Sequence, residues 1–490
     1  MELHIDTENP SIVRLVDFID QHGEILESLT YKDKAAHFAY MRFKNSFFFK
    51  SKMDPDEYEA KLADLKSQVK KSILFQDDKG WYTYSGLTQY LHLKTKAPIV
   101  NTVKYPNHNT LPWANVPEYE PYPFQTLAED ALLRTLHGGV EIGTGLGKTF
   151  IIVKILRRLG LKTIVMTPAT NLSESIYDEL VRAFGKKYVG AFYDGKKESG
   201  KLIVVANAQS LTRVTEGTPH WDNLKSSKVF VADESHSCPA STLANVCLGV
   251  AAYAPYRFFF SATQTRGDGR TLTLDGITGP IVYKKTVREG VDEGFLAKPS
   301  FRIVKMRSES SYENRDIMMM NRRHLLYNPA VTEKVGKLAN LAANVGMPVL
   351  ILVEEIEQFT NLLPFLRHKT GFAHGTLTKD NIGDLPKEYH KSDVKGLVKQ
   401  FNKGELQILV GTSCVSTGTD TRPVKMLIYW QGGSSEIQIK QAVGRGTRKP
   451  PGKTGVTVVD FDIENIEDLH RHCGLRKDIY EELYPDVKDL

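Results

Sequence analysis

Short apolar runs recur along the middle of the chain, and polar or small residues bound each of them. Each run is a few residues long and rich in β-branched or aromatic residues, which is typical of strands buried on both faces of a parallel sheet. The first four are Thr163–Met166, Leu202–Val205, Val229–Val231 and Phe258–Phe260. A helical stretch, Asn171–Phe184, lies between the first two runs. This alternation of strands and helices predicts a doubly wound α/β domain.

A second series of the same kind begins after Ala297-Lys298-Pro299. Its strand candidates are Val349–Val353, Gln407–Val410, Lys425–Tyr429 and Val456–Val459. The pattern therefore predicts two doubly wound α/β domains in tandem, over residues 109–298 and 299–490, the second of which ends in helices.

Residues 1–108 lack any catalytic signature and are rich in aromatic residues and lysines. A proline-rich stretch from Tyr105 to Pro123 follows, which is typical of an irregular connector between domains. Within the N-terminal region, Tyr40–Lys44 and Phe47–Lys52 interleave rings with cations, as nucleic-acid-binding strands often do. The same pattern suits a small amphipathic sheet with its aromatic side chains in the core. We expect a small accessory domain here, and both interpretations of its aromatic residues stand.

Composition excludes several classes of protein but does not indicate a function. At 490 residues the chain suits about three domains, and 41% hydrophobic with 25% charged residues are typical of a globular protein. The net charge of +6 permits nucleic-acid binding but does not require it. No apolar run approaches the roughly 18 residues of a membrane-spanning helix, and the acidic N-terminus lacks a signal-peptide pattern. The 4 cysteines show no Cys-x-x-Cys spacing, which argues against a zinc ribbon or a disulfide framework, so we expect a reducing cytoplasm.

A glycine-rich loop, Gly143–Thr149, precedes an apolar helical run that ends at Gly160. Glycines let successive backbone N–H groups curl around phosphate oxygens, and the following helix points its positive end at them. We expect the lysine to reach the β- and γ-phosphates and the threonine hydroxyl to bind Mg²⁺. The strict pattern has a glycine where this chain has Ile142. The predicted nucleotide-binding residues of the loop are Gly143, Thr144, Gly145, Gly147, Lys148 and Thr149.

Two adjacent carboxylates, Asp233 and Glu234, directly follow the apolar run Lys228–Ala232. Ligands of α/β sheets bind at the carboxyl ends of the strands, so this position suits a magnesium nucleotide. We expect Asp233 to hold Mg²⁺ and Glu234 to polarise the attacking water as a general base. This part of the chain thus predicts a site that hydrolyses ATP with Mg²⁺.

The tetrad Asp233-Glu234-Ser235-His236 resembles the DExH box of one branch of helicase superfamily 2. Further along, Gln441-Ala442-Val443-Gly444-Arg445-Gly446-Thr447-Arg448 is similar to motif VI of the same superfamily, QxxGRxxR. A cation brought from a second domain stabilises charge on the γ-phosphate only when the cleft closes, which ties hydrolysis to domain motion. The resemblance implies that Arg448 is the arginine finger and that Arg445 and Gln441 contact the γ-phosphate region.

Ser261-Ala262-Thr263 resembles motif III, which couples hydrolysis to movement in this superfamily. The resemblance implies that Ser261 and Thr263, together with His236, serve this coupling. The continuation through Arg266 to Gly269 resembles the SATPxRxDG form of double-stranded-DNA motors, with Gln264 in place of the proline.

Weaker similarities to motifs of the same superfamily indicate the remaining residues of the expected site. Gly411-Thr412 and Gly418-Thr419-Asp420 resemble motif V, which implies Thr412 at the nucleic-acid backbone and Gly418 and Asp420 at the nucleotide. Tyr122–Gln125 resembles the element in which a glutamine, here Gln125, reads the adenine edge, with a surface glutamine as the alternative. Thr167–Thr170 and Ala206–Ser210 fall where motifs Ia and Ib are expected, with ordinary strand-to-helix loops as the alternative. The residues implied to touch nucleic acid are Thr167, Pro168, Thr170, Gln209, Arg266 and Thr412.

The resemblance covers about residues 120–465 and implies two RecA-like domains that hydrolyse ATP between them. Compact members with this motif III run include recombination, replication-fork and repair helicases, and the chain looks similar to phage-type branch-migrating DNA helicases. We therefore expect an ATP-dependent DNA helicase or translocase that acts on branched or forked duplex, in the host cytoplasm if a phage encodes it. The alternatives are an RNA helicase of the DExH type, a motor subunit of a restriction enzyme, and a P-loop switch ATPase that separates no strands.

Overall fold

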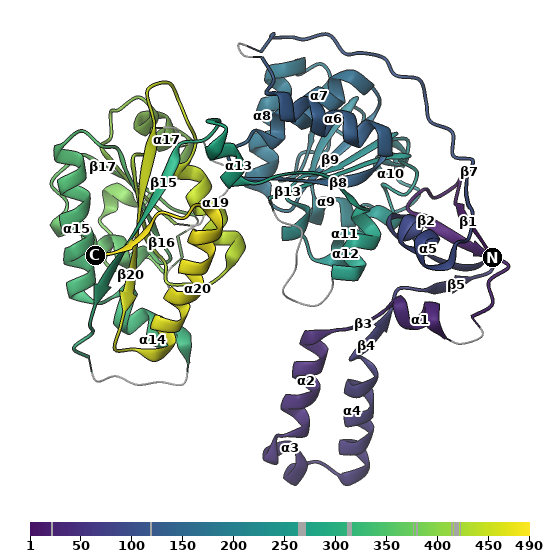
Figure 1. Cartoon of the computed structure of the whole chain (residues 1–490), viewed down its shortest axis with the longest axis horizontal. Coiled ribbons are helices and arrows are strands. Elements are labelled where there is room, and N and C mark those ends of the chain that lie inside the picture. Colours follow the sequence, from purple (N-terminus) through teal and green to yellow (C-terminus); the bar gives the residue numbers. More distant parts are fainter. Residues whose placement is uncertain are drawn as a thin grey trace. The chain divides into compact units, whose positions relative to one another are not determined.

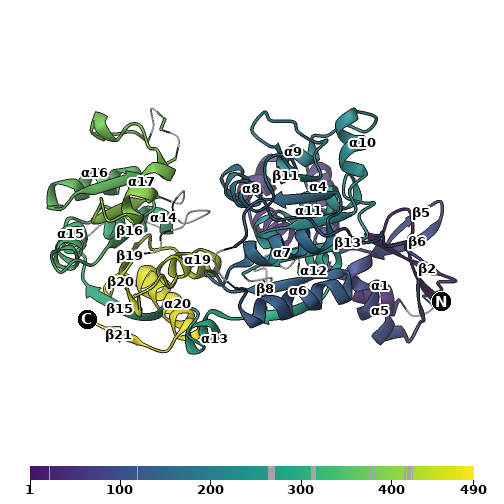
Figure 2. The same ribbon diagram turned by 90° about the horizontal axis from the view of Figure 1, so that it is seen from above.

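Figures 1 and 2 show the computed structural model of the chain. It describes residues 1–20, 23–117, 120–262, 271–310, 316–375, 377–378, 381–412, 415, 421 and 423–490. By their internal contacts the residues form two compact units. One comprises Met1–Glu141 and Thr149–Lys284, and the other comprises Ile142–Lys148 and Lys285–Leu490. None of the helices in the described part of the chain is long and apolar enough to cross a membrane.

A seven-stranded sheet forms the centre of the first α/β domain, in the order β10-β11-β9-β12-β13-β8-β14. Its strands are β8 His137–Ile142, β9 Thr163–Thr167, β10 Val189–Phe192, β11 Ile203–Asn207, β12 Val229–Ala232, β13 Tyr256–Ser261 and β14 Ile281–Lys285. From β10 to β8 all neighbouring strands pair in parallel. The four strands predicted in this half are confirmed, as is the helix between the first two, which is α8, Thr170–Phe184.

Helices cover both faces of this sheet, which explains why its strands are apolar throughout. In Figure 1, α6 (Pro123–Thr135) and α7 (Lys148–Leu159) lie above the strands, and α11 (Ala240–Leu248) and α12 (Thr271–Thr278) lie below them. The strands β9, β11 and β12 are buried at every position. A strand buried on both faces has no solvent side, so its side chains do not alternate between apolar and polar.

A second seven-stranded sheet has the order β17-β18-β16-β19-β20-β15-β21. Its strands are β15 Lys298–Met306, β16 Val349–Val353, β17 Thr370–Ala373, β18 Ile408–Gly411, β19 Met426–Trp430, β20 Gly455–Ile463 and β21 Val487–Asp489. Its longer helices are α15 Pro329–Asn344, α17 Val394–Asn402, α19 Glu436–Gly446 and α20 Glu467–Leu483. All of its printed strand pairs are parallel. The prediction of tandem RecA-like α/β domains is confirmed.

The N-terminal region forms a five-stranded sheet in the order β5-β6-β2-β1-β7. Its strands are β1 Glu2–Ile5, β2 Ile12–Val16, β5 Phe75–Asp77, β6 Gly80–Tyr84 and β7 Ile99–Asn101. Its buried residues share one hydrophobic cluster with those of the first α/β domain. Ser11 donates a hydrogen bond from Oγ to Cys247 O (2.7 Å), and a Cβ atom on Gly86 would lie 2.4 Å from Gly276 O. This region and the first α/β domain are therefore one compact unit.

Residues 34–67 form a helical hairpin attached to this region by two short strands, β3 Thr30–Lys32 and β4 Lys70–Ser72 (Figure 1). Its helices are α2 Lys34–Lys44, α3 Phe47–Lys52 and α4 Pro55–Ser67. The expectation of strands over residues 40–52 is wrong. Residues 34–52 contain no β-branched residue, and Asp33 caps α2 by accepting a hydrogen bond from Ala36 N–H (3.1 Å). These local helix signals outweigh the aromatic residues that suggested a sheet.

The close approach at Gly86 predicts that Gly86→Ala destabilises the first unit. A methyl group there would meet the backbone of α12, because Gly276 O and Gly279 N lie 2.4 and 2.6 Å from the Cβ position. We expect a loss of about 1–3 kcal/mol of unfolding free energy, as for other overpacked sites. Calorimetry measures the temperature of the transition in which this unit unfolds. Gly200→Ala is the control, since nothing lies within 4 Å of its Cβ position. Equal transition temperatures for the two variants would contradict this packing.

Candidate functional site

The predicted motifs of the first sheet follow the carboxyl ends of parallel strands. The phosphate loop follows β8, the pair Asp233-Glu234 follows β12, and Ser261 ends β13. Thr167 ends β9, and Asn207 ends β11. Parallel strands end at the same edge of a sheet, and ligands of α/β sheets bind at this edge. The residues at the ends of β9, β11, β12 and β13 therefore lie along one edge of the sheet.

The phosphate loop turns sharply between β8 and α7. Gly145 and Gly147 have φ angles of 91° and 79°, which side-chain-bearing residues rarely adopt, so the loop needs glycine at both positions. Lys148 and Thr149 are the first two residues of α7, at its positive end. Ile142 stands where the strict pattern has glycine, and it is the fully buried last residue of β8. Its side chain belongs to the sheet core, which explains this departure.

Asp233 and Glu234 stand directly after β12, as the sequence predicts. Asp233 N–H donates to Met166 O (2.9 Å), and Asp233 Oδ1 accepts from Glu234 N–H (3.0 Å). Glu234 has a φ of 49°, in the left-handed region that non-glycine residues seldom occupy. Backbone conformations of this kind cluster at functional sites, where the surrounding structure holds them. Both residues are half-buried, and the Oε2 atom of Glu234 is itself buried.

His236 links the carboxylate pair to the end of β13. Its Nδ1 atom lies 2.6 Å from Ser261 Oγ and 3.4 Å from Glu234 Oε2. Both His236 and Ser261 are buried, so this contact is shielded from solvent. The structure thus joins two of the three residues that the sequence assigns to coupling.

The loop after β9 is ordered from within by Thr167. This residue is fully buried, and its Oγ1 lies 2.6 Å from Ser173 Oγ and donates to Ala169 O (3.1 Å). Pro168 is half-buried at the surface of the same loop. The Thr167 hydroxyl therefore positions the loop, whereas Pro168 forms part of the surface of the loop.

The loop after β11 is bonded to the loop after β9. Asn207 donates from Nδ2 to Thr170 Oγ1 (3.0 Å), and its Oδ1 accepts from Ser210 N–H (2.8 Å) at the start of α9, Ala208–Thr212. Thr170 is half-buried and Gln209 is exposed. Asn207 was not among the predicted contact residues; a helix-capping asparagine at a strand end is the signal that points to it.

Gln125 is buried, with 2% of its surface exposed, so the alternative of a surface glutamine is wrong. Its Oε1 accepts a hydrogen bond from Tyr122 N–H (3.0 Å), at the start of α6. The amide group therefore takes part in the cap of this helix.

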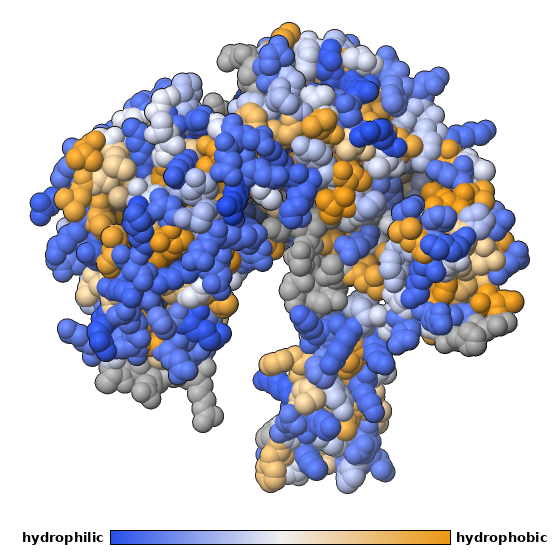
Figure 3. All heavy atoms as spheres, in the orientation of Figure 1, coloured by the Kyte–Doolittle hydropathy of each residue, from blue (hydrophilic) through white to orange (hydrophobic). Residues whose placement is uncertain are grey.

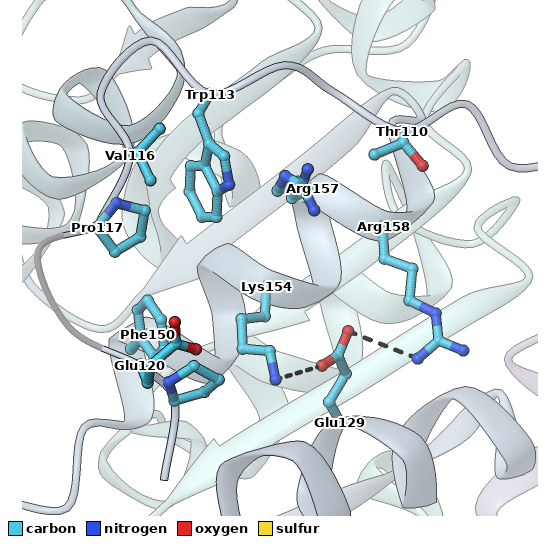
Figure 4. A pocket seen from close by; sticks show the side chains of 11 residues that line it. Thr110, Trp113, Val116, Pro117, Glu120, Glu129, Phe150, Lys154, Arg157 and Arg158 are labelled. Carbon is cyan, nitrogen blue, oxygen red and sulfur yellow. Dashed lines mark ion pairs between the residues drawn. The ribbon is translucent and has the colours of Figure 1, made fainter.

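A cavity of about 320 Å³ lies beside α6 and α7 (Figure 4). The Trp113 ring forms part of its wall, and Arg157 lies over this ring at 5.0 Å from its centroid. Glu129 is buried and pairs with Lys154 (2.8 Å), which compensates its charge. Phe150, which follows Thr149 of the phosphate loop in the sequence, also lines the cavity.

Motif VI lies on α19 and just beyond its end. Arg445 is buried, whereas Gln441 and Arg448 are half-buried. Thr412 directly follows β18, and its N–H donates to Ala373 O (3.1 Å). Four predicted site residues lie outside the residues that the structure describes, namely Thr263, Arg266, Gly418 and Asp420.

A buried ion pair holds the turn that leads into α19. Arg476 of α20 contacts the carboxylate of Asp460 with two nitrogens (2.6 and 3.1 Å) and donates to Gly432 O (3.0 Å). Tyr480 donates to the same carboxylate (3.0 Å). Burial alone would lower the pKa of Arg476, but the Asp460 carboxylate raises it above its usual value. No sequence motif pointed to this network, because Gly432 and Asp460 lie 44 and 16 residues before Arg476.

Known proteins share this architecture. The family model described as "Type III restriction enzyme, res subunit" matches residues 118–266, and "Helicase conserved C-terminal domain" matches residues 333–449. Probable helicase D10 of Escherichia phage T5 is 28% identical over 335 residues, which cover 67% of this chain and 68% of that protein. DNA 3'-5' translocase XPB2 of Sulfurisphaera tokodaii is 22% identical over 353 residues, or 66% of this chain and 78% of that protein. A fragment of a putative HsdR subunit of a type I restriction enzyme from Vibrio vulnificus has a TM-score of 0.54 at 18% identity, with 77% and 69% of the two chains covered.

Two parallel α/β domains, a phosphate loop, a DExH box and a motif VI helix define an ATP-hydrolysing helicase. The chain belongs to helicase superfamily 2 and resembles the phage-type helicases of that superfamily.

The contact between His236 and Ser261 predicts that Ser261→Ala uncouples hydrolysis from strand separation. The change removes one buried hydroxyl and leaves the carboxylate pair in place. We expect strand separation per ATP hydrolysed to fall roughly tenfold, as the loss of one hydrogen bond of about 1.4 kcal/mol would give. Parallel assays of ATP turnover and unwinding measure this ratio. The exposed neighbour Ser237→Ala is the control, and an unchanged ratio in Ser261→Ala would count against the role in coupling.

The network around Arg476 predicts a large loss of stability in Arg476→Met. Removing one partner of a buried ion pair leaves the Asp460 charge uncompensated, which costs about 3–5 kcal/mol. Arg302→Met is the matched control, because Arg302 pairs with the partly exposed Asp486 at 3.3 Å, and such pairs contribute about 0–1 kcal/mol. Chemical denaturation of both variants gives the comparison. Equal effects would show that the buried pair carries no special weight.

Proposed function

We propose that this helicase acts on DNA and that its substrate is branched or forked duplex. The observation that carries the proposal is the run Ser261–Gly269, which resembles the SATPxRxDG form of double-stranded-DNA motors. The family description over residues 118–266 names a restriction-enzyme subunit, and one relative is named a DNA 3'-5' translocase. Another relative is named a putative RNA helicase, so RNA is the alternative substrate.

In this proposal the first domain binds the nucleotide and activates water. Lys148 neutralises the β- and γ-phosphates, and the Thr149 hydroxyl and the Asp233 carboxylate hold Mg²⁺. Oxygen ligands of these two kinds suit Mg²⁺, which would stabilise negative charge on the phosphates. Glu234 accepts a proton from the attacking water, and its half-buried carboxylate at the sheet edge suits a general base. Gln125 reads the adenine edge, which requires its amide to exchange the bond with Tyr122 N–H or to use its NH₂ group.

The second domain contributes cations in the same proposal. Arg448 acts as the arginine finger, and Arg445 and Gln441 contact the γ-phosphate region. Gly418 and Asp420 complete the nucleotide site. Thr170, Pro168, Gln209, Arg266 and Thr412 contact the nucleic-acid backbone, while Thr167 orders its loop from inside. Hydrolysis, closure of the domains and movement along the strand are then one cycle, coupled through His236, Ser261 and Thr263.

The substrate is tested by the rate of ATP hydrolysis with a panel of nucleic acids. The panel holds no nucleic acid, single-stranded DNA, blunt duplex, forked DNA, four-way DNA and RNA duplex, each with wild-type protein and Lys148→Ala. Stronger stimulation by forked or four-way DNA than by blunt duplex would support the proposal. Stimulation mainly by RNA would make the protein an RNA helicase, and stimulation by none would favour a switch ATPase.

The assigned chemistry predicts three distinct variants. Lys148→Ala should abolish turnover because the phosphate charge is no longer neutralised. Glu234→Gln should bind ATP but not hydrolyse it, since the amide cannot accept the proton. Arg448→Ala should reduce turnover by roughly 10³-fold, the effect of losing an arginine finger. Nucleotide binding and steady-state turnover measure the three effects. Lys449→Ala, an exposed neighbour, is the control for Arg448, and equal turnover in these two would remove Arg448 from its role.

A further inference from the structure

The α2–α4 hairpin, residues 34–67, projects from the N-terminal sheet (Figure 1). Among its described side chains only Tyr58 is buried. Figure 3 shows apolar patches among hydrophilic residues on this hairpin, at the bottom of the view. A segment with so small a core is unusual in a folded unit that elsewhere shares a large hydrophobic cluster.

Three aromatic rings hold the hairpin together. The Phe43 ring stacks on Phe49 at 5.0 Å and on Tyr58 at 5.1 Å between centroids, and Tyr58 donates from its hydroxyl to Lys44 O (3.2 Å). These rings join α2, α3 and α4, so packing accounts for them. Phe38 and Phe47 take no part in this stack, and they are 74% and 84% exposed. Packing within the hairpin therefore accounts for neither Phe38 nor Phe47.

Charge is distributed unevenly over the hairpin. Residues 34–53, which form α2 and α3, contain no Asp or Glu. Their cations are Lys34, Arg42, Lys44, Lys50 and Lys52. The helix α4 instead carries Asp56, Glu57, Glu59 and Asp64 beside Lys61 and Lys66. Within the described part of the chain, neither Arg42 nor Lys50 forms an ion pair. The α2–α3 segment is therefore a positive surface, whereas α4 is not.

The two exposed rings lie beside these cations. Lys34, Phe38 and Arg42 follow one another at intervals of four residues, which places them on one face of α2. On α3, Phe47 and Lys50 are three residues apart and again share a face. Each helix thus offers a ring and a cation together. Nucleic acid is the partner that needs both, because cations neutralise its phosphates and rings stack on unpaired bases.

We propose that the α2–α3 segment is a DNA-binding element whose cations hold the phosphates of a duplex arm and whose rings, Phe38 and Phe47, stack on bases left unpaired at a branch point. A fully paired duplex offers no open base to stack on, so the rings give this element a preference for forks. The inference rests on the proposed function, since it takes DNA as the substrate, and it assigns the recognition of the branch to residues outside the motor motifs.

The test is equilibrium binding of labelled forked and blunt DNA, without ATP and at several salt concentrations. The ring pair Phe38→Ala/Phe47→Ala should bind forked DNA roughly 10- to 100-fold more weakly, and blunt duplex about as well as wild type. The cation pair Arg42→Ala/Lys50→Ala should weaken binding to both DNAs. It should also reduce the slope of log affinity against log salt by about 1.8, since each duplex phosphate contact contributes about 0.9.

The pair Lys61→Ala/Lys66→Ala on α4 removes the same charge from the same hairpin and serves as the control. It should bind both DNAs like wild type. All substituted side chains are exposed, and unchanged unfolding temperatures would confirm that the aromatic stack is intact. A ring pair that binds forked DNA like wild type would overturn the proposal. So would a control pair that loses as much affinity as the cation pair.

The two proposals fail separately. If wild-type ATPase is stimulated by branched DNA while the hairpin variants bind forks normally, only the hairpin assignment is wrong. If the rings bind RNA forks in preference to DNA forks, the hairpin assignment to DNA is wrong whatever the ATPase panel shows. If no nucleic acid stimulates the ATPase but the ring pair still loses fork binding, the motor function fails and the hairpin assignment holds.

Discussion

Parallel pairing of buried strands is the constraint on which the site depends. The strands β11, β9, β12, β13 and β8 pair in parallel, so the loop after each one leaves the sheet at the same edge. The apolar side chains of the strands are covered by helices on both faces, so these strands have no solvent side. The sheet therefore positions loops with different functional groups next to one another, whatever the sequence of each loop.

Polar side chains at this edge divide into an inner set and an outer set. His236, Ser261 and Thr167 are buried and bonded to other protein groups, so they order the loops. Gln209 is exposed and Glu234 is half-buried, so the outer set lies closer to the surface. A hydrogen bond shielded from water is stronger than the same bond in water. The buried residues can therefore fix the positions of the loops that carry the outer set.

The N-terminal region contains a sheet that packs against the first α/β domain and a hairpin that has little core of its own. Its sheet completes the core of the first α/β domain, as the contact between Gly86 and Gly276 requires, whereas the α2–α4 hairpin depends on a single aromatic stack. The interleaved rings and cations of residues 40–52 predict strands. The structure separates them, because Phe43 packs inside the hairpin while Phe47 is exposed. Alternating rings and cations do not distinguish a strand from two short helices, since both leave some rings on a shared face.

Elements that depend on a local pattern can be predicted from the sequence. Uniformly apolar runs predicted strands such as β12 and β16, and glycines at Gly145 and Gly147 predicted the phosphate loop, because these signals lie within a few adjacent residues. The strand β15 was not predicted, since Arg302 and Lys305 interrupt its apolar run. Tertiary structure alone decided the contacts of Asn207 with Thr170 and of Arg476 with Gly432. Such contacts join residues that are distant along the chain, and they form only once the sheets have fixed where each loop lies.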